Sequence, residues 1–314
     1  MELRNLGKSG LRVSVVGLGC NNFGGRIDQE ATRKVIHRAF DLGINLFDTA
    51  DIYGNLGGSE TAMGEVMGSR RKEIVLASKC GMAMDTEGKL KGASRRYIMS
   101  AVEDSLRRLK TDWIDLYQIH QPDPLTPIEE TLRTLDDLVR SGKVRYIGCS
   151  NFPAWLVAQS QETSARLNLN SFISCQDEYS LLVRGLDKES IPAMQAYGLG
   201  LLPFFPLASG LLTGKYKRNA PMPEGARLTN TQRLADRYIN DVNWQIVERL
   251  GDFATTRGHS MLELAFSWLA CRPTVVSVIA GATKPEQLEQ NVKAVDWKLT
   301  AEEMSEIDRV TQRA

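Results

Sequence analysis

The sequence predicts a (β/α)8 TIM barrel that spans residues 1–314 as one domain, with an N-terminal β-hairpin and extra helices near the C-terminus. Eight short apolar runs rich in β-branched residues alternate with amphipathic helical stretches. Alternation of this kind, repeated eight times, favours a parallel sheet that closes on itself. No linker or low-complexity segment divides the chain, and α/β barrels of this length commonly form a single domain.

The predicted elements follow one another in a regular order. The segment RNLGKSGLRVS reads as a hairpin that turns at KSG. Helical periodicity is clearest in residues 29–43, 94–110 and 128–142. The predicted strands are residues 13–20, 45–50, 74–79, 115–120, 144–150, 172–178, 198–206 and 275–281.

Glycine and proline mark several boundaries of these elements. Gly43 and Gly142 follow helical stretches as C-terminal caps, and Pro153 stands near the start of a helix, where its missing N–H costs little. The longest irregular stretch is residues 217–236, and a loop of that length is usually functional or mobile. We expect it to lie over the mouth of the barrel.

The composition excludes several classes of protein. Lys and Arg total 39 against 38 acidic residues, so the net charge of +1 predicts no nucleic-acid or anionic-membrane partner. The five cysteines are scattered without a CxxC pair, which argues against a disulfide framework or a metal site. The N-terminus lacks a signal-peptide pattern and no run of 18 apolar residues occurs, so we expect a cytoplasmic protein.

Four chemically active side chains stand at or just after the ends of three predicted strands. Asp48 and Tyr53 follow NLFDTA, Lys79 ends IVLASK, and His120 ends DLYQIH. The C-terminal ends of barrel strands open onto one face, so these side chains are expected to meet. An ammonium beside a phenol stabilises the phenolate, a carboxylate fixes the ammonium, and an imidazole can orient a carbonyl oxygen. The set predicts the reduction or formation of a C=O bond.

Each of these residues also has a structural interpretation. A strand-end aspartate is often a cap, the lysine of SKCG could be a surface residue, and the tyrosine of DIYG could be a buried aromatic. His120 is less ambiguous, because it is one of only three histidines and precedes the loop signal QPDP. Four such coincidences at strand ends favour a functional site.

The chain resembles the aldo-keto reductases over nearly its whole length. The order and spacing of seven segments carry this resemblance, and together they are far more specific than a lone DxxxY. These segments are GINLFDTADIYG, ASKCG, DLYQIHQPD, IGCSN, SCQDEYS, FFPLASGLLTGKY and GATKPEQLEQN.

The resemblance implies that NADP(H), with NAD(H) as the alternative, binds at the barrel mouth and delivers a hydride to an aldehyde or ketone. Tyr53 would protonate the oxygen, Lys79 and Asp48 would tune Tyr53, and His120 would orient the carbonyl. The amides and hydroxyl of Ser150, Asn151 and Gln176 also suit a carboxamide. The implied cofactor residues are Cys20, Asn21, Asp48, Ser150, Asn151, Gln176, Phe204, Phe205, Pro206, Leu207, Ser209, Gly210, Lys215, Arg227, Gly281, Thr283, Lys284, Gln287, Gln290 and Asn291.

Two of these positions depart from the family pattern. Gln287 stands where many NADP-preferring relatives carry Arg, and Gln290 stands where many carry Glu. Lys284 and the free N–H groups at the following helix start are still expected to form an anion site. No GxGxxG opens a helix after a strand, so a Rossmann fold is not predicted.

The substrate pocket is expected to hold a small carbonyl compound beside the four strand-end residues. Cys20, Asn21 and Asn22 follow the first strand and border the site. The predicted pocket residues are Asn22, Phe23, Tyr53, Met82, His120, Phe152 and Tyr179.

Two other functions remain open at this point. The N-terminal segment resembles that of the family's channel-associated β subunits, in which a barrel senses nicotinamide redox state for a partner. In those subunits an Asn takes the position of His120. The presence here of all four strand-end residues therefore favours an enzyme. A barrel lyase or isomerase with a Schiff base on Lys79 is the third hypothesis. The flanking Asp48 and Tyr53, together with Phe204 and the GATKPEQLEQN segment, argue against it.

Overall fold

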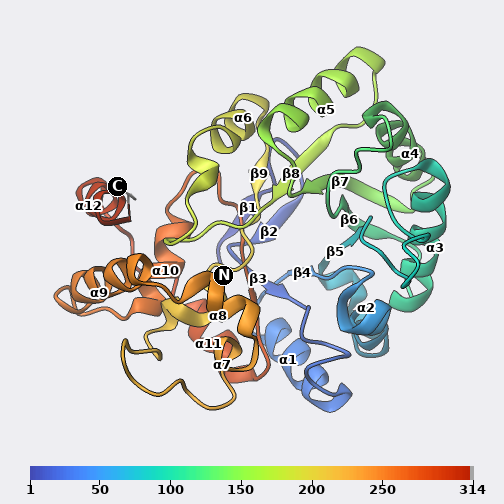
Figure 1. Cartoon of the computed structure of the whole chain (residues 1–314). Coiled ribbons are helices and arrows are strands. Elements are labelled where there is room, and N and C mark those ends of the chain that lie inside the picture. The colour runs from blue at the N-terminus through green and yellow to red at the C-terminus, as the bar shows by residue number, and fades with distance from the viewer. Residues whose placement is uncertain (312–314) are drawn as a thin grey trace.

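The structure, a computed structural model, describes residues 1–311 and contains the predicted barrel. Its eight strands are all parallel and lie in the order β10-β3-β4-β5-β6-β7-β8-β9 (Figure 1). They are β3 (Val16–Gly19), β4 (Leu46–Asp48), β5 (Val75–Cys80), β6 (Ile114–Ile119), β7 (Val144–Ser150), β8 (Phe172–Gln176), β9 (Gly200–Leu201) and β10 (Val278–Gly281).

Backbone hydrogen bonds between β9 and the chain before β10 close the barrel. The Leu201 N–H donates to the Thr274 carbonyl at 2.8 Å, and the Val276 N–H donates to the Leu201 carbonyl at 3.0 Å. The strand β9 has only two residues. It ends early because Pro203 has no N–H to continue the ladder and Phe205 has a positive φ of 51°. The predicted strand 198–206 is therefore mostly loop.

Helices surround the barrel as the alternating pattern predicts. Those that follow the strands are α1 (Gln29–Asp41), α2 (Tyr53–Met67), α3 (Arg95–Leu109), α4 (Ile128–Arg140), α5 (Ala154–Leu167), α6 (Ser190–Tyr197), α10 (Met261–Ala270) and α11 (Pro285–Lys293). Gly43 and Gly142 lie just beyond α1 and α4 with φ of 72° and 76°, and Pro153 is the N-cap of α5. These three predicted boundaries are confirmed.

Additional helices lie beside the barrel in the last third of the chain. They are α7 (Arg227–Asn230), α8 (Gln232–Tyr238), α9 (Asp241–Thr255) and α12 (Ala301–Thr311), and they gather with α10 and α11 on one side (Figure 1). The predicted irregular stretch 217–236 is only partly irregular, because α7 and most of α8 fall within it. The short helices η1 (Gly68–Glu73), η2 (Gly185–Asp187) and η3 (Ala208–Thr213) complete the chain.

The hairpin of β1 (Leu3–Asn5) and β2 (Arg12–Ser14) covers the end of the barrel where the strands begin. Leu6 and Val13 are fully buried and pack against the apolar side chains inside the barrel, Leu46 and Leu116 among them. Val13 was predicted within the first barrel strand, but it pairs in the hairpin and β3 begins at Val16. The hairpin leaves the C-terminal ends of the strands for the site.

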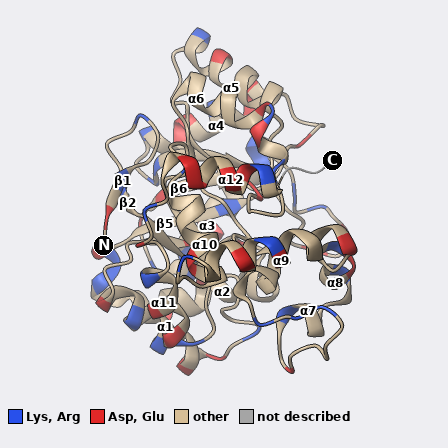
Figure 2. Ribbon diagram, turned by 90° about the vertical axis from the view of Figure 1, so that its left-hand side faces the viewer, with Lys and Arg blue, Asp and Glu red and all other residues tan. Residues whose placement is uncertain are grey.

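Charged residues are mixed over the surface. Figure 2 shows basic and acidic residues interspersed along the outer helices. No helix within residues 1–311 is long and apolar enough to cross a membrane.

Candidate active site

The four predicted catalytic side chains meet at the C-terminal ends of neighbouring strands. Asp48 is the last residue of β4, Lys79 lies near the end of β5, His120 directly follows β6, and Tyr53 begins α2. Lys79 is fully buried, while Asp48, Tyr53 and His120 line a cavity above it. The barrel topology thus brings one carboxylate, one ammonium, one phenol and one imidazole together.

Lys79 and Asp48 form a buried ion pair. The Lys79 ammonium donates to Asp48 Oδ2 at 2.7 Å and to the Thr49 carbonyl at 2.8 Å. Burial alone would lower the pKa of Lys79, but Asp48 and then Tyr53 oppose it, and the net pKa lies above its usual value. The lysine therefore carries its charge at neutral pH.

The other oxygen of Asp48 is held by side-chain amides. Asp48 Oδ1 accepts hydrogen bonds from Gln176 at 2.8 Å and from Gln118 at 3.4 Å. These amides come from β8 and β6, so three strands fix the carboxylate. A carboxylate with this many donors is oriented before any ligand arrives.

Tyr53 lies directly beside this ion pair. The Lys79 ammonium is 5.1 Å from the centre of the Tyr53 ring. Burial raises the pKa of the Tyr53 phenol above its usual value, and Lys79 opposes this rise without reversing it. The expected stabilisation of the phenolate by Lys79 is therefore present but smaller than the effect of burial, and Tyr53 keeps its proton at neutral pH.

His120 packs edge-on against Tyr53. The two ring centres are 5.6 Å apart and the ring planes meet at 83°. Burial, with a smaller contribution from Lys79, lowers the pKa of His120 to about 3. The imidazole is consequently neutral, and its Nδ1 is buried without a hydrogen-bond partner among residues 1–311. A neutral imidazole offers one donor and one acceptor to a bound molecule.

The cavity above these residues has a volume of about 720 Å³. This lies within the range of ligand pockets. Every residue predicted to bind cofactor lines it, including those of β10 and the start of α11. Its lining residues are Gly19, Cys20, Asn21, Asn22, Arg26, Asp48, Tyr53, His120, Ser150, Asn151, Gln176, Phe204, Phe205, Pro206, Leu207, Ser209, Gly210, Thr213, Lys215, Gly225, Ala226, Arg227, Leu262, Ile279, Ala280, Gly281, Thr283, Lys284, Gln287, Gln290 and Asn291.

Polar groups near the strand ends hold one another. Asn151 Nδ2 donates to the His120 carbonyl and to Ser150 Oγ, both at 3.0 Å. Ser150 Oγ donates to the Gln176 carbonyl at 2.7 Å. Gln176 Nε2 already donates to Asp48. Within the described chain, Asn151 Oδ1 and Gln176 Oε1 remain as acceptors, which suits the NH2 of a carboxamide.

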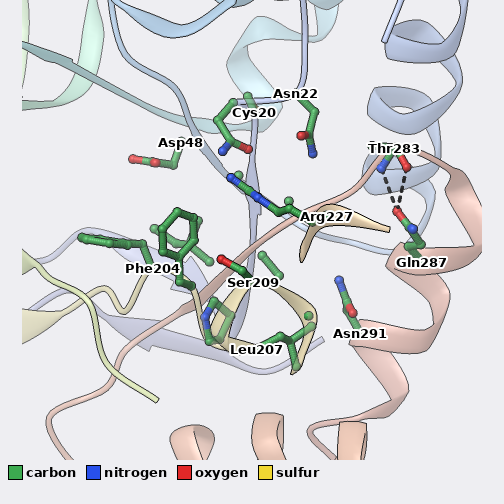
Figure 3. Close-up of a pocket in the computed structure, with 18 of the residues that line it drawn as sticks. Cys20, Asn22, Asp48, Phe204, Leu207, Ser209, Arg227, Thr283, Gln287 and Asn291 are labelled. Atoms are coloured by element: carbon green, nitrogen blue, oxygen red, sulfur yellow. Dashed lines mark hydrogen bonds between the residues drawn. The ribbon is translucent and has the colours of Figure 1, made fainter. Parts of the chain in front are cut away.

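Besides Lys284, three cations on the cavity wall have no carboxylate partner in the part of the chain that the structure describes. They are Arg26, Lys215 and Arg227. Arg227 packs over the Phe205 ring at 4.9 Å and points into the space between Cys20 and Phe204 (Figure 3). Burial lowers the pKa of both Lys215 and Arg227, and the charge of Arg26 lowers it further. Clustered cations of this kind suit an anionic ligand.

Arg26 is a cavity residue that the sequence did not point to. It lies in the loop after β3, and its guanidinium donates to the Gly225 carbonyl at 3.5 Å. The loop after β3 and the irregular part of residues 217–226 therefore touch across the cavity. The prediction that this stretch lies over the barrel mouth agrees with the position of Gly225, Ala226 and Arg227 on the cavity wall.

The far end of the cavity is formed by the turn between β10 and α11. The Thr283 N–H and hydroxyl donate to Gln287 Oε1 at 2.7 and 3.3 Å (Figure 3). The Thr283 N–H, which precedes the N-cap residue of α11, is thus occupied by Gln287 and is not free for an anion. Lys284, the N-cap residue of α11, is exposed beside it.

Four of the predicted pocket residues lie outside the cavity lining. Phe23 and Tyr179 are fully buried, and the Tyr179 phenol donates to Asp187 at 2.5 Å. Phe152 packs on Phe172 in the core, and Met82 is not on the cavity wall. Each follows a strand end, as predicted, but none lines the cavity. Only Asn22, Tyr53 and His120 of the predicted set line the cavity.

The two cysteines near the site are buried, which makes them unsuited to act as nucleophiles. Cys20 and Cys80 are fully buried, and burial raises the pKa of both thiols. Thiols with raised pKa values are poor nucleophiles. All five cysteines are free.

Two glycines let the loop after β3 lie against the segment that carries Tyr53. Gly24 has φ +65°, and a Cβ there would lie 2.3 Å from the backbone carbonyl of Gly58. Gly54, next to Tyr53, has φ +67°, and its Cβ would lie 2.4 Å from the Phe23 carbonyl oxygen. Backbone atoms cannot give way as side chains do, so glycine is required at both positions.

We expect Gly24→Ala to destabilise the protein more than Gly258→Ala. Gly258 has a similar φ of +76°, but a Cβ there meets nothing within 4 Å. Both variants incur about 1–2 kcal/mol from the left-handed backbone, and Gly24→Ala adds about 1–3 kcal/mol of overpacking. Urea titrations of both variants give the difference in free energy of unfolding. Equal losses would show that the Gly24–Gly58 contact relaxes freely.

The fold and the site together define a barrel oxidoreductase. The chain belongs to the Aldo/keto reductase family, whose family model matches residues 15–312. Members of this family generally use nicotinamide cofactors, usually NADPH, and act on small carbonyl compounds.

Three relatives cover nearly the whole chain. A probable voltage-gated potassium channel subunit beta from Oryza sativa is 38% identical over 99% of this chain and 97% of its own. An L-glyceraldehyde 3-phosphate reductase from Escherichia coli O157:H7 is 35% identical over 98% and 92%. The uncharacterized oxidoreductase YrpG from Bacillus subtilis is 37% identical over 96% and 93%.

Proposed function

We propose that this protein reduces an aldehyde or ketone to the alcohol with NADPH, and that Tyr53 is the general acid. The observation that carries the proposal is a protonated phenol on the cavity wall beside the Lys79–Asp48 ion pair, with a neutral imidazole packed against it. This combination suits proton delivery to a carbonyl oxygen.

Each residue has a distinct part in this scheme. The bound nicotinamide supplies the hydride. Tyr53 donates its proton to the substrate oxygen, and the Lys79 ammonium stabilises the negative charge that forms on the phenol oxygen. Asp48 holds Lys79 in place, and the neutral His120 offers an N–H to the carbonyl oxygen.

The cavity lining supports a dinucleotide in one orientation. The nicotinamide carboxamide would bind Asn151 and Gln176 through their free oxygens, and its ring would stack on Phe204. Arg26, Lys215 and Arg227 would meet the phosphates, since they have no acidic partner in the described chain. Gly281, Thr283, Lys284, Gln287, Gln290 and Asn291 would hold the adenosine end, and the remaining implied cofactor residues would line the path between the two.

Lys284→Ala should reduce the preference for NADPH over NADH. A charge-assisted contact to the 2′-phosphate is worth roughly 1.5–3 kcal/mol, or about tenfold to a hundredfold in affinity. We expect the low end, because Gln287 is uncharged and its oxygen already holds Thr283. Titrating both cofactors by fluorescence gives the ratio of their dissociation constants.

Lys293→Ala is the matched control for this measurement. Lys293 is an exposed lysine in the last turn of the same helix, so its loss removes the same charge away from the helix start. Equal affinity of the wild type for both cofactors would show that the 2′-phosphate is not recognised. If Lys284→Ala leaves the ratio of the two dissociation constants unchanged, another residue must contact the 2′-phosphate, and Arg227 is the next candidate.

A panel of aldehydes and ketones tests the reaction itself. Loss of NADPH absorbance in the near ultraviolet reports turnover, and the panel tests reaction class and substrate range together. Tyr53→Phe serves as the blank for background oxidation. Binding of NADPH without turnover of any carbonyl would count against an enzymatic role.

The relative from rice supports a second candidate, a nicotinamide-binding subunit that reports redox state to a partner. His120 favours the enzyme, because its neutral imidazole faces the cavity next to Tyr53. Schiff-base chemistry on Lys79 is disfavoured by its charge and by its complete burial beneath the cavity floor. Borohydride trapping with substrate distinguishes this case, since only a Schiff base leaves a covalent adduct on Lys79.

A further inference from the structure

Asp177, the residue after β8, is a buried carboxylate that the scheme above does not use. It is 4% exposed. Its Oδ1 accepts the Asn151 N–H at 2.8 Å, and its backbone carbonyl accepts the Phe204 N–H at 3.0 Å. Its Oδ2 is buried without a hydrogen-bond partner among the described residues. Asp177 is therefore hydrogen-bonded to two of the residues proposed to hold the nicotinamide, Asn151 and Phe204.

Asn151 needs such support because its backbone is strained. Its φ is +60°, a left-handed conformation that costs a non-glycine residue roughly 1–2 kcal/mol. The Asn151 N–H is shared between Asp177 Oδ1 and the Gln176 carbonyl, which lies farther away at 3.2 Å. Its side chain in turn holds the His120 carbonyl. The carboxyl of Asp177 thus supports a residue that is hydrogen-bonded to the backbone of His120.

We propose that Asp177 is a positioning residue for the nicotinamide: its carboxyl fixes Asn151 while its carbonyl fixes Phe204, so that the carboxamide and ring contacts keep one geometry. This inference rests on the proposed nicotinamide site. It assigns Asp177 no contact with the cofactor, because Asp177 does not line the cavity.

The Asp177 carboxyl holds Asn151 by accepting a hydrogen bond, and this does not require the carboxyl to be charged. Burial raises the pKa of Asp177 to about 7, and the Asn151 N–H lowers it only in part. Near neutral pH the group is therefore often uncharged, and a neutral carbonyl oxygen can still accept the Asn151 N–H. Asp177→Asn keeps that acceptor, whereas Asp177→Ala removes it.

The test compares NADPH with 2′,5′-ADP, which carries the adenosine end but lacks the nicotinamide. In Asp177→Ala we expect the dissociation constant of NADPH to rise about three- to tenfold, the worth of one hydrogen bond. The dissociation constant of 2′,5′-ADP should stay within about twofold, because only the nicotinamide end is affected. Asp177→Asn should restore NADPH affinity to within about twofold of the wild type.

Asp136→Ala is the matched structural control. Asp136 on α4 accepts the Asn170 N–H at 2.8 Å, as Asp177 accepts that of Asn151, but Asn170 does not line the cavity whereas Asn151 does. Its loss should lower thermal stability and leave the ratio of the two affinities unchanged. The inference would be overturned if Asp177→Ala weakened the binding of NADPH and of 2′,5′-ADP by the same factor. It would also be overturned if both affinities stayed unchanged.

Asp177→Asn keeps the inference testable if Asp177→Ala does not fold. A folded Asp177→Asn protein with NADPH affinity reduced more than about twofold would also overturn it. Failure of the wild type to bind NADPH or NADH would instead overturn the nicotinamide site, and this inference with it. The wild-type titration therefore separates the two failures.

Discussion

Tyr53→Phe is expected to lower the turnover number for carbonyl reduction by about 10² to 10⁴ while leaving NADPH affinity nearly unchanged. The substitution removes only the phenol oxygen, and the remaining ring still packs against His120 and Lys79. Loss of the proton donor acts on the transition state and not on the bound cofactor. Turnover and fluorescence titration in the same preparation measure the two effects separately.

Tyr197→Phe is a suitable control for the Tyr53 variant. Tyr197 lies on α6, where its phenol donates to Glu162 at 2.9 Å on the surface. Its loss should leave both turnover and NADPH affinity unchanged. Turnover above a tenth of the wild-type value in Tyr53→Phe would remove Tyr53 from the role of general acid.

Lys79→Met should also abolish most activity, and it should shift the basic limb of the pH profile to higher pH. The ammonium lowers the pKa of Tyr53 against the larger effect of burial, so its removal raises that pKa further. A phenol must be protonated to act as the acid, and the reaction therefore fails at a higher pH than in the wild type. Turnover number against pH, with residual activity normalised, is the measurement.

The Lys79 variant also loses one partner of a buried ion pair. Asp48 would be left as a buried carboxyl that can take up a proton, which limits the stability loss to somewhat under the roughly 3–5 kcal/mol typical of a broken buried pair. Arg108→Met is the matched control, because Arg108 pairs with the fully buried Glu60 at 2.7 Å. It should cost stability without moving the basic limb. An unshifted limb in Lys79→Met would show that the ammonium does not tune Tyr53.

The barrel and its four strand-end residues could be predicted because both follow from local sequence pattern. Apolar runs bounded by turn signals mark the strands, and parallel topology then places Asp48, Lys79 and His120 on one face. The family resemblance added the cofactor residues of the second half, all of which line the cavity. Pattern and topology together fix where the backbone of the site lies.

The remaining cavity wall could not be predicted, because side-chain direction and distant contacts decide it. Tyr179 follows a strand end as expected, yet its ring packs against Trp268 in the core, 5.1 Å between centres. Arg26 reaches the cavity through a contact with Gly225, 199 residues away in sequence. The shortness of β9 has a local cause in Pro203. The closure of the barrel at β9, in contrast, depends on a hydrogen bond to the distant Thr274.

The junction between β9 and β10 has a consequence for how a dinucleotide would act on the barrel. It is made by a few backbone hydrogen bonds around Leu201, so we infer that local opening of the ring starts there. The loop after β9 contributes Phe204 and Lys215 to the cavity, and β10 with α11 contributes Lys284 from the other side. A ligand bound to both sides would link the loop after β9 to the turn between β10 and α11. At a hundred times its dissociation constant it would add about 2.7 kcal/mol to the free energy of unfolding.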